Sequence, residues 1–182
     1  MKVSHKFYLK KNKHSQQLLL ALEQIKLLAL DVDGVLTDGS IYVDSNGNES
    51  KKFYAHDGYG IVSIREKFGI ETVVISGRSS KALLHRLEEL NISRFWMGQA
   101  DKLSAINLIL QEGIESHQIL FVGDDIPDLD LIESVGLFVA VRNAHKMLKD
   151  KAHYITKNFG GQGAVREVCD LIEYSNERTI ND

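Results

Sequence analysis

Short apolar runs alternate with amphipathic stretches along most of the chain. Five runs have the length and composition of strands that are buried on both faces: residues 27–32, 71–75, 94–97, 119–122 and 137–141. Four stretches between and after these runs carry apolar side chains at helical spacing: residues 81–90, 102–112, 129–135 and 165–174. The alternation predicts an α/β fold, a doubly wound parallel sheet covered by helices on both faces in three layers.

The segment between the first two strands has a different pattern. β-prone runs at residues 41–43 and 51–54 flank Asn46-Gly47, a pair that is typical of tight hairpin turns. The sequence therefore predicts a protruding β-hairpin at about residues 40–54, followed by a helix that ends at Gly69. Because the hairpin and this helix fill the interval, we expect no cap domain there.

The length of 182 residues suits one domain with a substantial core. We expect an N-terminal extension at residues 1–26 with an accessory helix at 14–25, the main domain at 27–175 and a tail at 176–182. Hydrophobic residues at 43% and charged residues at 26% are ordinary for a globular protein. No apolar run approaches the roughly 20 residues of a membrane span.

Charge and cysteine content narrow the possible functions. A formal net charge of −3 argues against a nucleic-acid-binding protein, which usually carries a basic excess. Cys169 is the only cysteine, so the chain can form neither an intrachain disulfide nor a cysteine-rich zinc site. The basic N-terminus lacks the apolar segment of a signal peptide. We therefore expect a cytoplasmic protein without membrane insertion.

Two carboxylates follow the first buried run directly. Asp31 and Asp33 are two residues apart, so in extended chain both side chains point to the same side while Val32 packs inward. Like charges this close repel each other unless a cation or a shared proton compensates. Mg²⁺ is the natural partner because it prefers hard oxygen ligands and often binds one or two carboxylates together with a phosphate.

A second acidic group follows the run at residues 119–122. Asp124, Asp125 and Asp128 lie within five residues of one another, and Pro127 can start the next helix. Without a metal ion such a cluster at a strand end is costly. Because ligands of parallel sheets bind beyond the carboxyl ends of the strands, we expect this group and the first pair of acids to face one site.

Two other polar positions fall at the same predicted edge. Ser76-Gly77 ends the second strand with a hydroxyl group and a residue that permits close backbone approach. Lys102 follows Asp101, a candidate N-cap, and so lies in the first turn of a helix, where an ammonium opposes the helix dipole. That local cost favours a functional role for Lys102.

Together these pieces resemble the motifs of the haloacid dehalogenase superfamily of phosphatases. The resemblance rests on Asp31-x-Asp33-Gly-x-x-Thr and on the three later motifs, which follow in the superfamily's order. It implies that Asp31 is a nucleophile toward phosphorus and that Asp33 is the general acid and base. It further implies that Ser76 donates a hydrogen bond to the transferring phosphoryl group and that Lys102 neutralises charge on the nucleophile and the phosphate.

The same resemblance assigns a magnesium site. Asp31 and Asp124 would bind Mg²⁺ directly, together with the main-chain carbonyl of Asp33. Asp125 and Asp128 would support these ligands without binding the ion themselves.

Further motifs are similar to the 3-deoxy-D-manno-octulosonate 8-phosphate (KDO 8-phosphate) phosphatase family. These motifs are Asp57-Gly58-Tyr59-Gly60, Gly98-Gln99 and Gly160-Gly161-Gln162-Gly163, the last of which continues to residue 170. The resemblance spans roughly residues 27–173. It implies a homotetramer whose hairpins pair in a central barrel, with active sites at subunit interfaces, and a phosphorylated acidic sugar as substrate. Its product, KDO, feeds lipopolysaccharide synthesis.

Substrate contacts are expected from residues near the motifs. Arg78, adjacent to Ser76, suits bidentate recognition of a carboxylate, and Gly77 would allow close approach of the substrate. Lys102 would contact the phosphate. His56 stands before Asp57-Gly58, where the family pattern has Arg, and is a further candidate substrate-binding residue.

Other functions stay open at this point. A phosphatase for the 9-phosphate of a nonulosonic acid, such as sialic acid or KDN, would share the capless architecture. A phosphoaspartate signalling receiver combines similar residue types, but its acidic pair would close the first strand and its acceptor aspartate a later one. A non-catalytic assembly module on the same fold is the third alternative, although no catalytic position is replaced.

Overall fold

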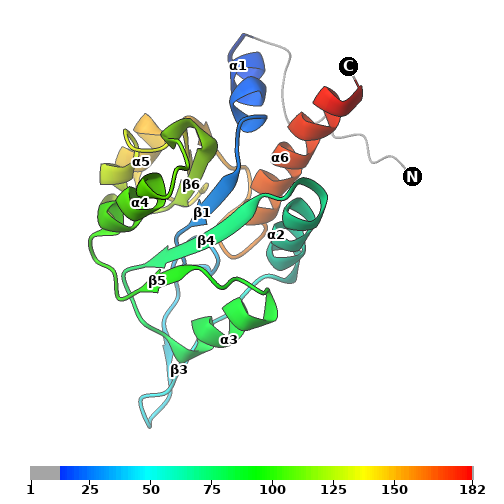
Figure 1. Ribbon diagram of the computed structural model, residues 1–182. Coiled ribbons are helices and arrows are strands. Elements are labelled where there is room, and N and C mark those ends of the chain that lie inside the picture. The colour runs from blue at the N-terminus through cyan, green and yellow to red at the C-terminus, as the bar shows by residue number, and fades with distance from the viewer. Residues whose placement is uncertain (1–12, 182) are drawn as a thin grey trace.

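Six parallel strands form the central sheet in the computed structural model, which describes residues 13–181 (Figure 1). In spatial order they are β5 (Phe95–Met97), β4 (Glu71–Ser76), β1 (Leu27–Leu30), β6 (Ile119–Gly123), β7 (Leu137–Ala140) and β8 (Tyr154–Ile155). β1 lies in the middle and pairs with β4 and β6, so that Leu30 is level with Val74 and Val122. The residues that follow these strands therefore meet at one edge, as the sequence predicts.

Helices cover both faces of the sheet, which confirms the three-layer α/β fold. They are α1 (Lys13–Leu22), α2 (Ala55–Phe68), α3 (Lys81–Glu89), α4 (Lys102–Gln111), α5 (Lys146–Lys151) and α6 (Ala164–Asn181). α2 packs along α6, which also contacts α1. α4 and α5 both contact the 3₁₀ helix η3 (Ile126–Leu131). Another 3₁₀ helix, η2 (Ser116–Gln118), precedes β6. Figure 1 shows these two groups on opposite sides of the strands.

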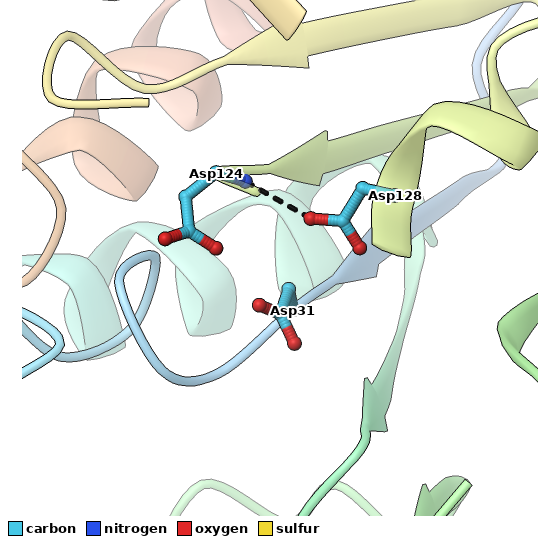
Figure 2. A group of neighbouring side chains, drawn as sticks. All are labelled: Asp31, Asp124 and Asp128. Carbon is cyan, nitrogen blue, oxygen red and sulfur yellow. Dashed lines mark hydrogen bonds between the residues drawn. The ribbon is translucent and has the colours of Figure 1, made fainter. Parts of the chain in front are cut away.

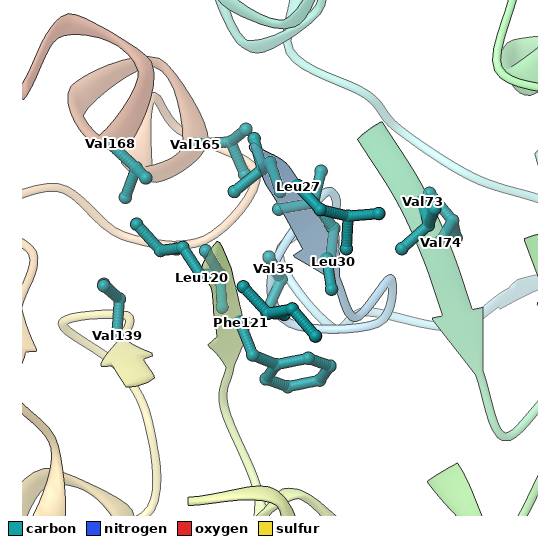
Figure 3. Packing of buried hydrophobic residues seen from close by; sticks show 14 of the residues in the cluster. Leu27, Leu30, Val35, Val73, Val74, Leu120, Phe121, Val139, Val165 and Val168 are labelled. Atoms are coloured by element: carbon teal, nitrogen blue, oxygen red, sulfur yellow. The ribbon is translucent and has the colours of Figure 1, made fainter. Parts of the chain in front are cut away.

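The core fills the space between the sheet and each helical layer. Leu120 of β6 points toward Val165 and Val168 of α6, and the next residue, Phe121, points to the other side (Figure 3). Phe121 stacks on Phe138 of β7, with 5.6 Å between ring centroids. Because alternate side chains of a strand face opposite ways, both faces must be apolar, and this explains the uninterrupted hydrophobic runs.

A short antiparallel hairpin protrudes after β1. It consists of β2 (Tyr42–Val43) and β3 (Glu49–Ser50), so the predicted hairpin is present but its second strand comes earlier than the predicted residues 51–54. The reason is the Asp44 carboxylate, which accepts hydrogen bonds from the N–H groups of Asn46 and Asn48 and closes the turn at Asn48. Among the described residues, the interval between β1 and β4 holds this hairpin and α2, with no cap domain.

Several predicted boundaries were wrong or incomplete. The predicted helix at residues 129–135 is instead η3, where the Asp128 side chain bonds to main-chain groups and the chain turns again at Ser134. α5 and β8 were not predicted, because each is short and has little apolar periodicity. α6 continues to Asn181, beyond the predicted end at residue 174. No helix in the described part of the chain is both long enough and apolar enough to cross a membrane.

Candidate active site

Asp31 lies at the carboxyl end of the central strand. Its main-chain N–H donates to the carbonyl of Val122 (3.0 Å), which extends the β1–β6 ladder by one residue and fixes the start of the loop. The buried Thr37 side chain closes this loop by donating to the carbonyl of Val32 (3.3 Å). Gly34 has φ +95°, and a Cβ atom there would lie only 2.0 Å from Asp124 Oδ2. Glycine is therefore required for the loop to accept the Asp124 carboxylate beside it.

Asp124 and Asp128 reach the same place from the end of β6. Asp128 Oδ2 accepts hydrogen bonds from the N–H groups of Asp124 (3.0 Å) and Asp125 (3.4 Å), which ties η3 to the strand end (Figure 2). Asp31, Asp124 and Asp128 each offer a carboxylate oxygen, and these oxygens lie within 4.8 Å of one another. Asp125 is exposed and contributes its main-chain N–H to this arrangement.

Lys102 neutralises part of this charge. Its Nζ lies 2.8 Å from Asp31 Oδ1 and 2.6 Å from Asp128 Oδ1, and its side chain is only 6% exposed. Burial alone would lower the pKa of Lys102, but the charges of Asp31 and Asp128 outweigh burial and raise it above its ordinary value. Asp101 caps the helix by accepting the N–H of Ser104 (3.2 Å), which places Lys102 in the first turn of α4.

The three carboxylates still carry more negative charge than Lys102 offsets. Burial, followed by the charge of Asp31, raises the pKa of Asp124 to about 8, and the same two causes raise the pKa of Asp128 to about 6. Three hard oxygen donors with uncompensated charge fit Mg²⁺. Both oxygens of Asp128 already accept protein hydrogen bonds, which favours Asp31 and Asp124 as the direct ligands. The Asp128 carboxylate nevertheless lies within the cluster.

Ser76 closes the neighbouring strand β4. Its side chain is buried, and Ser76 Oγ accepts the main-chain N–H of Arg78 (3.2 Å), so the hydroxyl hydrogen can be donated to another group. Gly77 is exposed, and a Cβ atom at that position would meet no atom within 4 Å. This leaves room beside Ser76 for a ligand.

Asp33 and Arg78 belong to a second charged cluster at the base of the hairpin. Asp33 is in contact with Lys51, whose Nζ also lies 2.9 Å from Glu49. Arg78 Nη2 lies 3.0 Å from Glu49, and Arg78 Nε lies 4.0 Å from Asp33 Oδ2. The sequence does not indicate Lys51 and Glu49 as site residues, because residues so far from Asp33 in the chain give no local signal of the contact.

His56 is a member of neither cluster. It occupies the first turn of α2, is exposed, and makes an edge contact with the ring of Tyr54, with 5.0 Å between ring centroids. No hydrogen bond or ion pair within the described residues joins His56 to the acidic cluster. Its predicted contact with the substrate therefore stays a prediction.

The glycine-rich loop before α6 packs onto the Asp31 loop, a contact that the sequence did not indicate. A Cβ atom on Gly160 would lie 1.6 Å from the carbonyl oxygen of Gly34, and the N–H of Gly161 donates to the carbonyl of Val35 (2.9 Å). Asn143, after β7, accepts the N–H of Gly160 (2.8 Å). Two loops that are distant in the sequence thus support each other at the site.

The strand order and the site residues together are typical of one superfamily of phosphatases. Haloacid dehalogenase-like phosphatases have a parallel sheet with the order β5-β4-β1-β6-β7-β8 and an aspartate after the central strand. They also have a buried lysine against that aspartate and acids after the next strand, as this chain does. The model of the haloacid dehalogenase-like hydrolase family matches residues 97–168.

Comparisons with individual proteins narrow the class. The KDO 8-phosphate phosphatase of Escherichia coli is 45% identical over 159 residues, which are 87% of this chain and 84% of that protein. The structure of the Yersinia pestis KDO 8-phosphate phosphatase has a TM-score of 0.84 and 42% identity, covering 88% of this chain and 86% of that one. The Moraxella catarrhalis enzyme, solved with a magnesium ion, a phosphate ion and KDO, has a TM-score of 0.85 and 39% identity, covering 91% and 97%. The chain therefore belongs to the KDO 8-phosphate phosphatase family.

Proposed function

We propose that this protein hydrolyses KDO 8-phosphate to KDO and inorganic phosphate through an aspartyl-phosphate intermediate. The observation that carries the proposal is the buried contact of Asp31 with Lys102, 2.8 Å from Nζ to Oδ1, beside the acidic cluster. The ammonium lowers the repulsion between an attacking carboxylate and an anionic phosphate. The relatives named above carry this activity in their names.

The reaction has two steps in this proposal. A carboxylate oxygen of Asp31 attacks phosphorus and the ester P–O bond breaks, while Asp33 gives a proton to the departing sugar oxygen. Asp33 then removes a proton from water, the water oxygen attacks phosphorus, and cleavage of the bond from phosphorus to Asp31 releases phosphate. Asp31 and Asp33 are both restored at the end.

The surrounding residues position the phosphoryl group. Ser76 would donate its hydroxyl hydrogen to a phosphoryl oxygen, and Lys102 would contact another. Asp31 and Asp124 would hold Mg²⁺ together with the main-chain carbonyl of Asp33, and the ion would supply charge neutralisation at the phosphate. Arg78 is 43% exposed and would be available to the carboxylate of the sugar if it exchanged its contact with Glu49.

We further propose that the enzyme is a cytoplasmic homotetramer that supplies KDO for lipopolysaccharide precursors. The hairpin supports the assembly, because Ile41, Tyr42 and Val43 expose apolar side chains on an isolated two-stranded ribbon. Replacing Ile41 and Val43 by lysine should give a smaller particle in light scattering. A double variant that remains a tetramer would contradict this part of the proposal.

The experiment that tests the activity is phosphate release with Mg²⁺ from a panel of sugar phosphates. KDO 8-phosphate is compared with the 9-phosphates of sialic acid and KDN, and Asp31→Asn serves as the inactive control. A clear preference for KDO 8-phosphate supports the proposal. Preference for a nine-carbon substrate would contradict the substrate assignment while leaving the phosphatase mechanism in place.

A further inference from the structure

Lys51 is a buried lysine that contacts the proposed acid and base. Its side chain is 3% exposed, and its Nζ contacts Asp33 Oδ1 and lies 2.9 Å from Glu49 Oε1. Burial of an ammonium is costly unless acidic partners compensate, and here two carboxylates do so. Lys51 directly follows β3, so the hairpin determines where this ammonium lies.

The other cation near Asp33 is placed less closely. Arg78 Nε is 4.0 Å from Asp33 Oδ2, and the Arg78 side chain is 43% exposed and bonded to Glu49. The two cations thus face different oxygens of Asp33, with the buried one in direct contact with Oδ1. A buried ion pair is screened less by solvent and orients its partners more firmly than an exposed one.

The adjacent lysine shows that this contact is specific to one residue. Lys52 is 58% exposed and pairs with Asp38, 2.7 Å from Nζ to Oδ2. Both lysines belong to the same short segment and carry the same charge, yet only Lys51 reaches the Asp33 carboxylate. Lys52 is therefore a matched control for substitutions of Lys51.

We infer that Lys51 is a positioning residue for the acid and base step. By holding Oδ1 of Asp33, Lys51 fixes the rotation of that carboxylate and directs Oδ2 toward the departing oxygen. No new bond is made to the substrate, and the proton still passes between Asp33 and the sugar oxygen. This inference rests on the proposed function, since it assigns a role within that reaction.

The test exploits the dependence of the first step on the leaving group. A sugar alkoxide needs a proton as it departs, whereas p-nitrophenolate is stable enough to leave without one. The value of kcat/KM reports this step, so it is measured for KDO 8-phosphate and for p-nitrophenyl phosphate with Mg²⁺. The variants are Lys51→Met, Lys51→Arg and the control Lys52→Met.

Lys51→Met should lower kcat/KM for KDO 8-phosphate by about 30-fold, which is part of the roughly 100- to 10,000-fold that general acid and base catalysis supplies, and for p-nitrophenyl phosphate by less than about 3-fold. Lys51→Arg should recover part of the loss, and Lys52→Met should leave both values unchanged. In an Asp33→Asn background, Lys51→Met should cause no further loss, because it acts through Asp33.

Equal losses on the two substrates, or a full further loss in the Asp33→Asn background, would overturn the role of Lys51. If Lys51→Met does not fold, Lys51→Arg takes its place in the test. A loss of kcat/KM for KDO 8-phosphate that exceeds the loss for p-nitrophenyl phosphate supports the inference, and an unchanged ratio of these two values overturns it. If the wild-type enzyme releases phosphate from neither substrate, the proposed function fails and the inference fails with it. An active wild type with a non-selective Lys51→Met defect overturns the inference alone.

Discussion

The two charged clusters at the catalytic edge differ in charge balance and in how they are built. The first cluster joins Asp31, Asp124 and Asp128 with Lys102, so three acids face one ammonium. Its members follow strands β1 and β6 or start helix α4, and Asp31, Asp128 and Lys102 are buried. An excess of negative charge held by a rigid sheet edge is what a divalent cation requires.

The second cluster joins Asp33 and Glu49 with Lys51 and Arg78, so two acids face two cations. It lies between the loop after β1, the hairpin and the end of β4, and three of its four members are partly exposed. Because its charges balance, it needs no metal ion. The first cluster is therefore suited to binding and attack, and the second to orienting one carboxylate and the hairpin beside it.

The largest effect should come from the nucleophile. Asp31→Asn removes the attacking carboxylate but keeps the size of the side chain, so phosphate release should fall by at least about a thousand-fold. The control is Asp130→Asn, an exposed acid of η3 that should keep full activity. Activity that persists in Asp31→Asn would place the attacking group outside the first cluster.

Lys102 should matter more for stability than Lys51. Lys102→Met leaves Asp31 and Asp128 without their shared cation, and breaking such a buried pair costs about 3–5 kcal/mol. Lys51→Met should cost less, since Asp33 is 23% exposed and water can solvate it. Urea denaturation of both variants without Mg²⁺ measures the difference. Equal losses would mean that the two clusters do not differ in burial as described.

Asp57 is a buried acid outside both clusters, and burial is the main cause of its pKa shift. Asp57 is buried, accepts the N–H of Arg166 (2.7 Å), and has its pKa raised from 3.8 to about 6, chiefly by burial. The folded state therefore holds this proton more tightly than the unfolded state, so stability falls by up to about 3 kcal/mol as pH rises from about 4 to 6. Asp57→Asn should remove this contribution and leave the one from the raised pKa of Asp128, so the decline should become shallower. Urea denaturation across this pH range checks it, and an identical slope in the variant would contradict the assignment.

Magnesium should stabilise the protein through the carboxylates of the first cluster and not through those of the second. An ion that binds only the folded state adds about 2.7 kcal/mol when its concentration is a hundred times its Kd. Asp124→Asn should weaken this stabilisation, whereas Glu49→Gln in the second cluster should not change it. Thermal unfolding with increasing Mg²⁺ measures both variants. A loss of the Mg²⁺ effect in Glu49→Gln would mean that the ion involves the hairpin cluster.

Much of the first cluster could be predicted because its signals are local. The apolar run before Asp31 and the run before Asp124 mark two strands, and parallel strands bring their carboxyl ends to one edge. Lys102 was indicated by an ammonium in the first turn of a helix, a position that calls for an explanation. These residues lie together in the structure, while their chemical roles stay predictions.

The second cluster and the loop contacts could not be predicted, because nothing near them in the chain encodes them. The contact of Lys51 with Asp33 depends on where Asp44 closes the hairpin turn, and a shift of the turn would move Lys51 away. The packing of Gly160 on Gly34 requires α6 to bring a distant loop back to the first strand.

The sequence indicates which acids follow which strands and that Asp31, Asp124 and Asp128 meet at one edge of the sheet. It also places Asp33 with them, whereas in the structure the Asp33 carboxylate belongs to the second cluster. The identity of the cation that contacts Asp33 follows from the three-dimensional structure, because that contact depends on the path of the chain between elements. Hydrophobic periodicity indicates the elements themselves and not that path.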